Sequence, residues 1–427
     1  MPRGGQRRAR VVGVVLSAAV TLSVLAPADA IGIAPSREST SVVSEAGSSG
    51  ARAAVTEMEA LDQAGRVGEP VEVLSLRGES SEVFATPDGN LEAREYLRPN
   101  RARLDGAWHS IDTDLAETGD GTVAPAATTV GLEFSGGGDA PLVRMTKAGR
   151  ELELSWPGGL PVPKLQGNTA LYPEVLSGVD LRLGAQEDGF TQLLVVKSAE
   201  AAAAEELTEL RMALDAHGMS VQKTREGGPR AVDKGAGSAV FEAPQPVMWD
   251  SSPGTAAQQT THTRIAETGD DLAKQDEPGA GETGKLAPVA VEMPLGGDEL
   301  ILKPDADVLK GDDTVYPVFI DPQWYSPKAS AWTMASKYWA SSPQWKFNGD
   351  PDAGMGYCNW AYCKPHDTKR LFYRIPVSKF AGKSVLSATF VVRNTWSASC
   401  NARGVQLWRT KGISSSTTWN SQNASGF

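Results

Sequence analysis

Alternation of apolar and polar residues is the main pattern in the first three quarters of the chain. Residues 179–183 and 190–197 alternate with period two, and Glu187-Asp188-Gly189 between them supplies hairpin turn residues. A second hairpin is predicted at Asp105-Gly106, since Asp-Gly between alternating residues is a strong hairpin signal. We therefore expect a mainly all-β fold, in which residues 68–322 form a β-sandwich.

One helix is expected to interrupt these strands. Residues 199–214 are rich in good helix formers, and Leu207, Leu210 and Leu214 fall on one face of a helix with 3.6 residues per turn. The sequence thus predicts a β-sandwich with one helix.

The first thirty residues have the layout of a secretory signal peptide. A basic start is followed by an apolar run over residues 11–25 and by the small-residue site Ala28-Asp29-Ala30. The run is shorter than the ~20 residues of a membrane helix, so an uncleaved anchor is the lesser alternative. We expect a secreted or cell-surface protein with no membrane span after signal removal.

Two segments are too polar to form a core. Residues 31–67 are rich in Ser, Ala, Gly and Glu, which predicts a disordered leader. Residues 251–286 are rich in turn residues, which predicts an exposed loop or linker within the sandwich domain.

The last quarter of the chain differs in composition. Residues 321–427 carry 13 Lys/Arg against four Asp, a net charge of +9, whereas the preceding 320 residues carry 28 basic and 48 acidic groups, a net of −20. All three cysteines lie there, as do eight of the eleven tryptophans: Trp324, Trp332, Trp339, Trp345, Trp360, Trp396, Trp408 and Trp419. Residues 323–427 are predicted to form a smaller, basic, aromatic-rich β-module with strands at 385–392 and 404–409.

Two stretches resemble known families. The segment YPEVLSGVDL at residues 172–181, followed by strands and by FEAPQPVMWD at 241–250, resembles the N-terminal β-sandwich domain of large secreted bacterial surface proteins. Residues 369–374, 381–390, 407–409 and 417–420 resemble the jelly-roll modules of actinobacterial exported proteins named for a DNRLRE signature, although that string is absent. The resemblance implies a non-catalytic protein. It also implies laminin-G-like jelly rolls or RHS-type repeats beyond Phe427. The odd number of cysteines and the abrupt end at residues 424–427 lead us to expect a truncated chain with an incomplete jelly roll.

The cysteines allow more than one pairing. Cys358, Cys363, His366 and Cys400 would suffice for a tetrahedral zinc site, but the spacing is unusual and export favours disulfides. We expect a Cys358–Cys363 disulfide, with Cys400 unpaired or lacking its partner; pairing of Cys400 with one of the two is the alternative.

Catalytic constellations are not evident in the sequence. No G-x-S-x-G motif occurs, the four histidines lie in unrelated contexts, and the carboxylates of the last quarter lie in turns. Asp350 and Asp352 are a weak calcium candidate through their oxygens. We predict no enzyme activity, no cofactor and no metal.

The aromatic residues indicate binding. Trp332, Trp339, Trp345, Trp360 and Tyr362 are predicted to form a ligand surface, since flat rings stack on sugars and nearby cations attract anionic polymers. Trp396 and Trp408 are expected in the core, and a core role for all the tryptophans is the alternative. The predicted partner is a polysaccharide or anionic cell-wall polymer. Nucleic acid is disfavoured by the acidic first domain. A structural stalk for a larger exported effector is the second hypothesis, and an accessory region of an extracellular hydrolase the third.

Overall fold

A computed structural model describes residues 52–252, 285–294, 297–349, 353–357, 366–392, 394, 397 and 404–423. The chain divides into two compact units. Unit 1 contains residues 1–110 and 377–402, and unit 2 contains residues 111–376 and 403–427. Each unit is described by itself.

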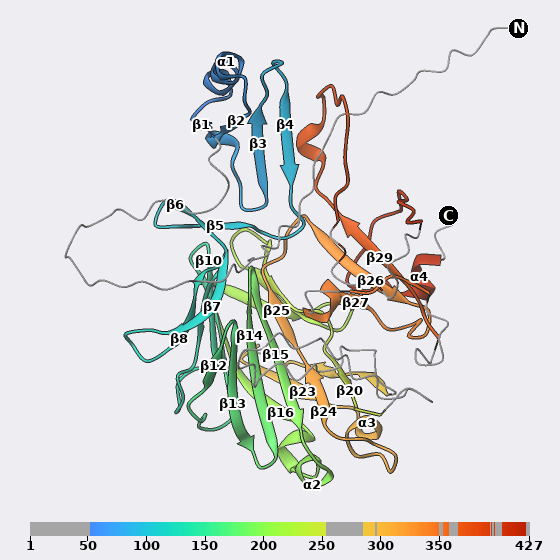
Figure 1. The fold of residues 1–427 in the computed structure, drawn as a ribbon. Coiled ribbons are helices and arrows are strands. Elements are labelled where there is room, and N and C mark those ends of the chain that lie inside the picture. The colour runs from blue at the N-terminus through green and yellow to red at the C-terminus, as the bar shows by residue number, and fades with distance from the viewer. Residues whose placement is uncertain are drawn as a thin grey trace, which may run out of the picture. The chain divides into compact units, whose positions relative to one another are not determined.

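Unit 1 is built on a small sheet of strand order β1-β2-β3-β4 (Figure 1). Its elements are β1 (Arg52–Ala54), α1 (Glu57–Val67), β2 (Val71–Val73), η1 (Leu74–Leu76), β3 (Ser81–Ala85), β4 (Leu91–Glu95), the hairpin β5 (Arg101–Leu104) and β6 (Ala107–Ser110), and η5 (Ser378–Phe380). The β5–β6 hairpin turns at Asp105-Gly106, which confirms that prediction.

Helix α1 lies within the stretch for which the sequence predicts disorder, so that prediction is wrong for residues 57–67. Thr56 and Glu59 form a capping box at its start, and Gly68 ends it in the left-handed conformation with φ of 73°. Ala60 and Ala64 are buried against the sheet. These small side chains let a short polar helix pack closely, which composition alone does not reveal.

A buried polar network covers the other face of this sheet. Arg77 donates two hydrogen bonds to Glu72, of 2.8 and 2.7 Å, and Arg101 pairs with Glu82. The Tyr96 hydroxyl donates to Glu82 at 2.8 Å. Burial, followed by this bond to a carboxylate, raises the pKa of Tyr96 from 10.0 to about 12.

The raised pKa of Tyr96 predicts alkaline destabilisation. The unfolded chain releases this proton first, so the contribution of Tyr96 to stability is intact below pH 10.0 and is lost as the pH rises towards 12. Urea unfolding at about pH 8 and about pH 11 should show a smaller loss of stability in Tyr96→Phe than in the wild type. Equal losses in the two proteins would contradict the assignment.

Unit 2 contains a β-sandwich, as the sequence predicts. One sheet has the order β22-β23-β16-β11-β10-β9-β8-β7. The other has the order β12-β13-β14-β15-β25-β19-β18-β17 with β20, β21 and β24 attached. The strands of the first sheet are β7 (Asp112–Glu117), β8 (Val123–Ala127), β9 (Gly131–Phe134), β10 (Val143–Lys147), β11 (Arg150–Ser155), β16 (Leu210–His217), β22 (Ala290–Glu292) and β23 (Glu299–Lys303).

The strands of the second sheet are β12 (Lys164–Gln166), β13 (Thr169–Leu176), β14 (Val179–Gln186), β15 (Gly189–Val196), β17 (Met219–Lys223), β18 (Pro229–Asp233), β19 (Ala239–Glu242), β20 (Val247–Trp249), β21 (Leu286–Pro288), β24 (Val318–Asp321) and β25 (Gln323–Tyr325). The long strands β13, β14 and β15 run side by side in Figure 1. The β14–β15 hairpin confirms the turn predicted at Glu187-Asp188-Gly189. Side chains from both sheets form one core, which includes Leu154, Leu181 and Phe190.

The predicted helix over residues 199–214 is wrong for most of its length. Only α2 (Ala199–Ala202) is α-helical, followed by η2 (Glu205–Leu207). Residues 210–217 form β16 between β11 and β23. Leu210, Met212 and Leu214 are buried and the residues between them exposed, so a period-two pattern that fits a central strand overrides the helix propensity.

A third, smaller sheet of order β27-β26-β29-β28 completes unit 2. Its elements are β26 (Ala331–Ser336), β27 (Gln344–Trp345), η3 (Lys346–Gly349), β28 (Gly356–Tyr357) and β29 (Thr368–Arg374). The remaining helices of the unit are α3 (Ala306–Lys310) and α4 (Trp419–Asn423).

Strand β25 belongs to two cores. Trp324 is 1% exposed and lies in the sandwich core, whereas the next residue, Tyr325, lies in the cluster beneath the third sheet. Since alternate side chains of a strand point to opposite faces, one short strand joins the two clusters. The domain boundary predicted at Pro322 therefore falls just before a strand that still pairs with β15.

Two strand predictions in the last quarter fail. Among the described residues of 385–392 and 404–409 none is in a strand. Leu386, Leu407 and Trp408 are 53%, 70% and 63% exposed, so the expectation that Trp408 fills a core is wrong. A strand needs a hydrogen-bonded neighbour as well as suitable residues, and neither segment has one in the described part of the chain.

Candidate ligand-binding surface

The third sheet is formed around aromatic side chains. Strands β26 and β29 pair antiparallel along their length, with Trp332 opposite Tyr373 and Thr333 opposite Phe372. The cluster beneath contains Tyr325, Ala331, Ala335, Trp345, Phe372 and Ile413, with Trp419 packed against it. The third sheet therefore covers a compact, mainly aromatic core.

Two of the tryptophans predicted to bind a ligand lie inside unit 2. Trp332 and Trp345 are 5% and 6% exposed. The Trp345 Nε1 donates to the Tyr325 hydroxyl at 2.9 Å. The Lys346 Nζ lies 3.6 Å from the centre of the Tyr325 ring and 5.2 Å from that of Trp332. The Tyr325 and Trp332 rings therefore face the protein's own lysine.

Trp339, the third predicted residue that the structure describes, lies at the surface. It is half-buried, and its neighbour Tyr338 is 39% exposed. The two rings make an edge-to-face contact, with centroids 4.7 Å apart and planes at 88°. The exposed part of such a pair offers apolar ring surface, of the kind on which a sugar ring can pack.

The segment that carries this pair is held by a carboxylate. Asp367 accepts hydrogen bonds from the Tyr338 backbone N–H at 2.9 Å, the Ser336 hydroxyl at 2.5 Å and the Thr368 N–H at 2.6 Å. The Ser336 hydroxyl oxygen in turn accepts from the Trp339 N–H at 3.1 Å. These hydrogen bonds make the turn directly after β26, which carries both rings, rigid.

Helix α4 adds a third ring beside this turn. The Asn420 N–H donates to the Ala340 carbonyl at 2.9 Å, and its side-chain amide donates to the Ser341 hydroxyl at 3.0 Å. Trp419, the residue before it, is half-buried beneath the Arg370 guanidinium, 4.7 Å from the ring centre. We call Tyr338, Trp339 and Trp419 the aromatic surface.

Several predicted site residues lie outside the described residues: Trp360, Tyr362, Cys358, Cys363, Cys400, Asp350, Asp352 and Trp396. Their roles stay predictions. His366 is described and makes an edge-to-face contact with the Tyr357 ring at 6.2 Å. Within the described part of the chain, no group of three or more His, Cys, Asp or Glu side chains is arranged to hold a metal ion.

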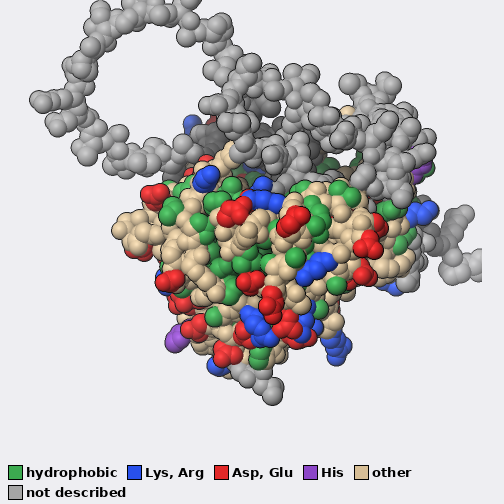
Figure 2. Space-filling model, turned by 90° about the horizontal axis from the view of Figure 1, so that it is seen from below, with side chains coloured by type: hydrophobic (Ala, Val, Ile, Leu, Met, Phe, Trp, Pro, Cys, Tyr) green, Lys and Arg blue, Asp and Glu red, His purple; other side chains and the backbone are tan. Residues whose placement is uncertain are grey.

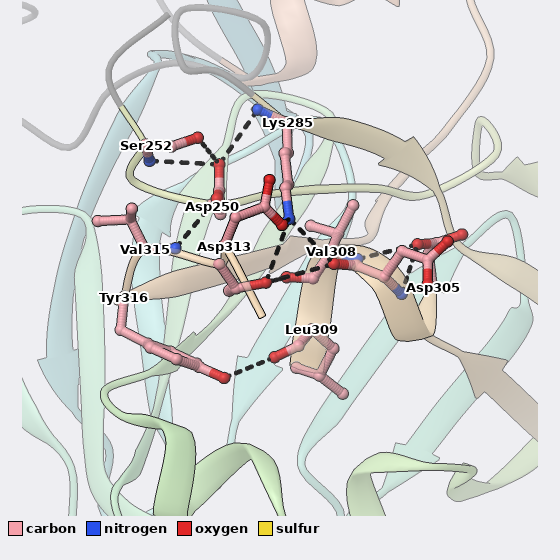
Figure 3. Close-up of polar contacts among 11 residues, drawn as sticks. Asp250, Ser252, Lys285, Asp305, Val308, Leu309, Asp313, Val315 and Tyr316 are labelled. Atoms are coloured by element: carbon pink, nitrogen blue, oxygen red, sulfur yellow. Dashed lines mark hydrogen bonds and ion pairs between the residues drawn. The ribbon is translucent and has the colours of Figure 1, made fainter. Parts of the chain in front are cut away.

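The densest polar cluster elsewhere in unit 2 surrounds Asp250 (Figure 3). This carboxylate is fully buried and accepts hydrogen bonds from Ser252, Lys285 and Val315. Lys285 Nζ pairs with Asp313, which is 83% exposed. Because Asp250 binds the backbone of its own loop and of the segments at Lys285 and Val315, we assign this cluster a structural role.

Charge does not gather on one side of the face drawn in Figure 2. Acidic and basic side chains are interspersed on the part of that face that is drawn in colour. No helix among the described residues is both long and apolar enough to cross a bilayer.

Comparison with protein-family models, curated proteins and solved structures finds no match to this chain. The sequence predicts a ligand-binding role for Trp339 but not for Tyr338 or Trp419. The Thr-Thr-Trp-Asn stretch at residues 417–420 is the signal that marks Trp419, and the hydrogen bonds of Asn420 to Ala340 and Ser341 bring α4 beside the turn.

Proposed function

We propose that this chain is an exported, non-catalytic protein whose aromatic surface binds carbohydrate. The observation that carries the proposal is the Tyr338–Trp339 pair, held on a rigid turn outside the aromatic core. Aromatic rings fixed in this way lose little conformational entropy when a sugar ring stacks on them.

Hydrogen-bonding groups border the same rings. The amide of Asn420 and the hydroxyl of Ser341 lie beside the turn, and Arg370 stacks over Trp419 and donates to Gln422 at 3.0 Å. Sugar hydroxyls need such donors and acceptors to fix their orientation. No Asp or Glu follows Asp367 in the sequence, so a polymer that carries carboxylates or phosphates would meet no acidic side chain from residues 368–427.

Retention on insoluble polymers tests this proposal. The full chain should sediment with purified bacterial cell walls or with chitin or cellulose, and Trp339→Ala should reduce the affinity about tenfold, since loss of one aromatic contact removes ~1.4 kcal/mol. Trp108→Ala is the matched control, because this half-buried tryptophan lies in unit 1. Equal retention of the two variants would exclude the aromatic surface as the site.

A structural stalk is the second candidate. It is supported by β25, which places Trp324 in the sandwich core and Tyr325 in the core beneath the third sheet. Such continuity suits a protein that transmits force to a further exported domain. The stalk predicts no retention on any of the polymers by the wild type, so the same experiment separates the candidates.

A further inference from the structure

A lysine and an aspartate form a buried pair between the sandwich and the third sheet. The Lys346 Nζ lies 2.9 Å from the Asp188 Oδ2, and the two side chains are 9% and 7% exposed. The residues are 158 positions apart in the sequence. No part of the proposed carbohydrate binding uses them.

The turn that carries Asp188 is fixed from three sides. The Thr129 N–H and hydroxyl both donate to the Glu187 carbonyl at 2.9 Å, and the Ser326 N–H donates to the Asp188 carbonyl at 2.8 Å. Strand β25 approaches so closely that a Cβ at Gly189 would lie 2.0 Å from the Trp324 carbonyl oxygen. The carboxyl group of Asp188 therefore has little freedom to move away.

The backbone at Lys346 has an unusual conformation that turns its side chain towards Asp188. Lys346 and Phe347 have φ of 51° and 55°, in the left-handed region that non-glycine residues rarely adopt. Two such residues in succession persist only when the surrounding structure imposes them. Here they direct the lysine side chain inward, where its Nζ lies over Tyr325 and near Trp332.

Amide formation between these two side chains requires their uncharged forms. Burying two opposite charges carries a desolvation penalty that mutual attraction offsets only in part. Passage of one proton along the 2.9 Å contact converts the ammonium and carboxylate into an amine and a carboxylic acid. The products are a nucleophile and an electrophile whose Nζ and Oδ2 atoms lie 2.9 Å apart.

We propose that Lys346 and Asp188 form an intramolecular amide bond. The Nζ lone pair of the neutral amine attacks the Asp188 Cγ, and the tetrahedral intermediate breaks its bond to one carboxyl oxygen. That oxygen leaves as water, carrying its own proton and one from the nitrogen. No oxidant or cofactor is required. Burial excludes the water needed for hydrolysis and so preserves the bond.

The amide bond would cross-link the third sheet to the sandwich. It joins the β14–β15 turn to the residue after β27, so unfolding could not separate them. This inference is independent of carbohydrate binding.

Intact-mass spectrometry of the reduced, folded full chain tests the proposal. We expect a mass lower than that of the sequence by one water molecule, and a branched tryptic peptide that contains both Asp188 and Lys346. Lys346→Arg should restore the full mass, because arginine keeps the positive charge but does not form the amide. Lys285→Arg is the matched control: Lys285 also pairs with an aspartate, Asp313, but an exposed one, and its replacement should leave the water loss unchanged.

Two results would overturn the proposal. One is the full sequence mass in wild-type protein whose near-ultraviolet circular dichroism shows native packing, which would leave the contact as an ordinary ion pair. The other is a water loss that remains in Lys346→Arg, which would assign it to cyclisation of an aspartate, with Asp188-Gly189 the first candidate.

Discussion

Trp324→Ala is expected to lower the free energy of unfolding of unit 2 by about 3–5 kcal/mol. The indole is among the largest fully buried side chains of the chain, at 1% exposure in the sandwich core. Its removal deletes apolar contacts and leaves a cavity that neighbouring strands fill only in part. Urea unfolding followed by circular dichroism measures the change.

The position of Trp324 makes a second effect visible. Its backbone pairs with Phe190 in β15, and the next residue, Tyr325, supports the third sheet. We therefore expect the variant to lose stability in the sandwich and the third sheet together. Trp408→Ala is the control, because Trp408 is 63% exposed and its replacement should change stability by no more than about 0.5 kcal/mol. Equal effects of the two substitutions would contradict the assignment of Trp324 to a shared core.

Asp250→Ala is expected to lower the free energy of unfolding by about 3 kcal/mol, since several part-buried donors lose their buried acceptor. The Oδ1 atom accepts from the N–H groups of Ser252 and Lys285 at 3.2 and 3.1 Å, and the Oδ2 atom from that of Val315 at 3.1 Å (Figure 3). Residues 252 and 285 flank residues 253–284, so one carboxylate holds both ends of the sequence between them.

Asp313→Ala is the matched control for this prediction. Asp313 also binds Lys285, but its side chain is 83% exposed, so solvent screens this ion pair and its loss should cost little. Thermal or urea unfolding should therefore show a clearly larger loss of stability in Asp250→Ala than in Asp313→Ala. A small effect of Asp250→Ala would show that water or other groups replace the lost acceptor.

Local turn chemistry made much of the fold predictable. The hairpins at Asp105-Gly106 and Glu187-Asp188-Gly189 have short loops whose residues specify the turn, so sequence alone placed them correctly. Helix propensity gave the wrong prediction at residues 210–217. These residues form strand β16 between β11 and β23, because Leu210, Met212 and Leu214 are buried there. Long-range pairing decides such segments.

Composition predicts an aromatic β-module in the last quarter of the chain, but it does not predict which of its rings are buried. Composition marks the last quarter as aromatic and basic, and the structure places a compact sheet there. Trp332 and Trp339 are seven residues apart, yet one is buried in the sheet and the other stands on the turn held by Asp367. Which ring is buried depends on how β26 pairs with β29, and this pairing cannot be predicted from the pattern of a single sequence.

The burial of Lys346 could not be predicted from the sequence either. Lys346 follows Trp345 in a stretch rich in turn residues, where a lysine is normally solvated. Its inward direction depends on left-handed backbone at two residues and on the arrival of Asp188 from a distant hairpin. Composition had suggested that cations near these rings would attract an external anion, whereas one of them is paired within the protein.

The most direct test of the proposed function is a calorimetric titration of the full chain with soluble fragments of bacterial cell-wall glycan. The proposed function predicts saturable binding by the wild type and by Trp108→Ala, and binding weakened about tenfold in Trp339→Ala and in Tyr338→Ala. Undiminished binding in both of the latter variants, or no binding by the wild type to any wall fragment, would contradict carbohydrate recognition by the aromatic surface.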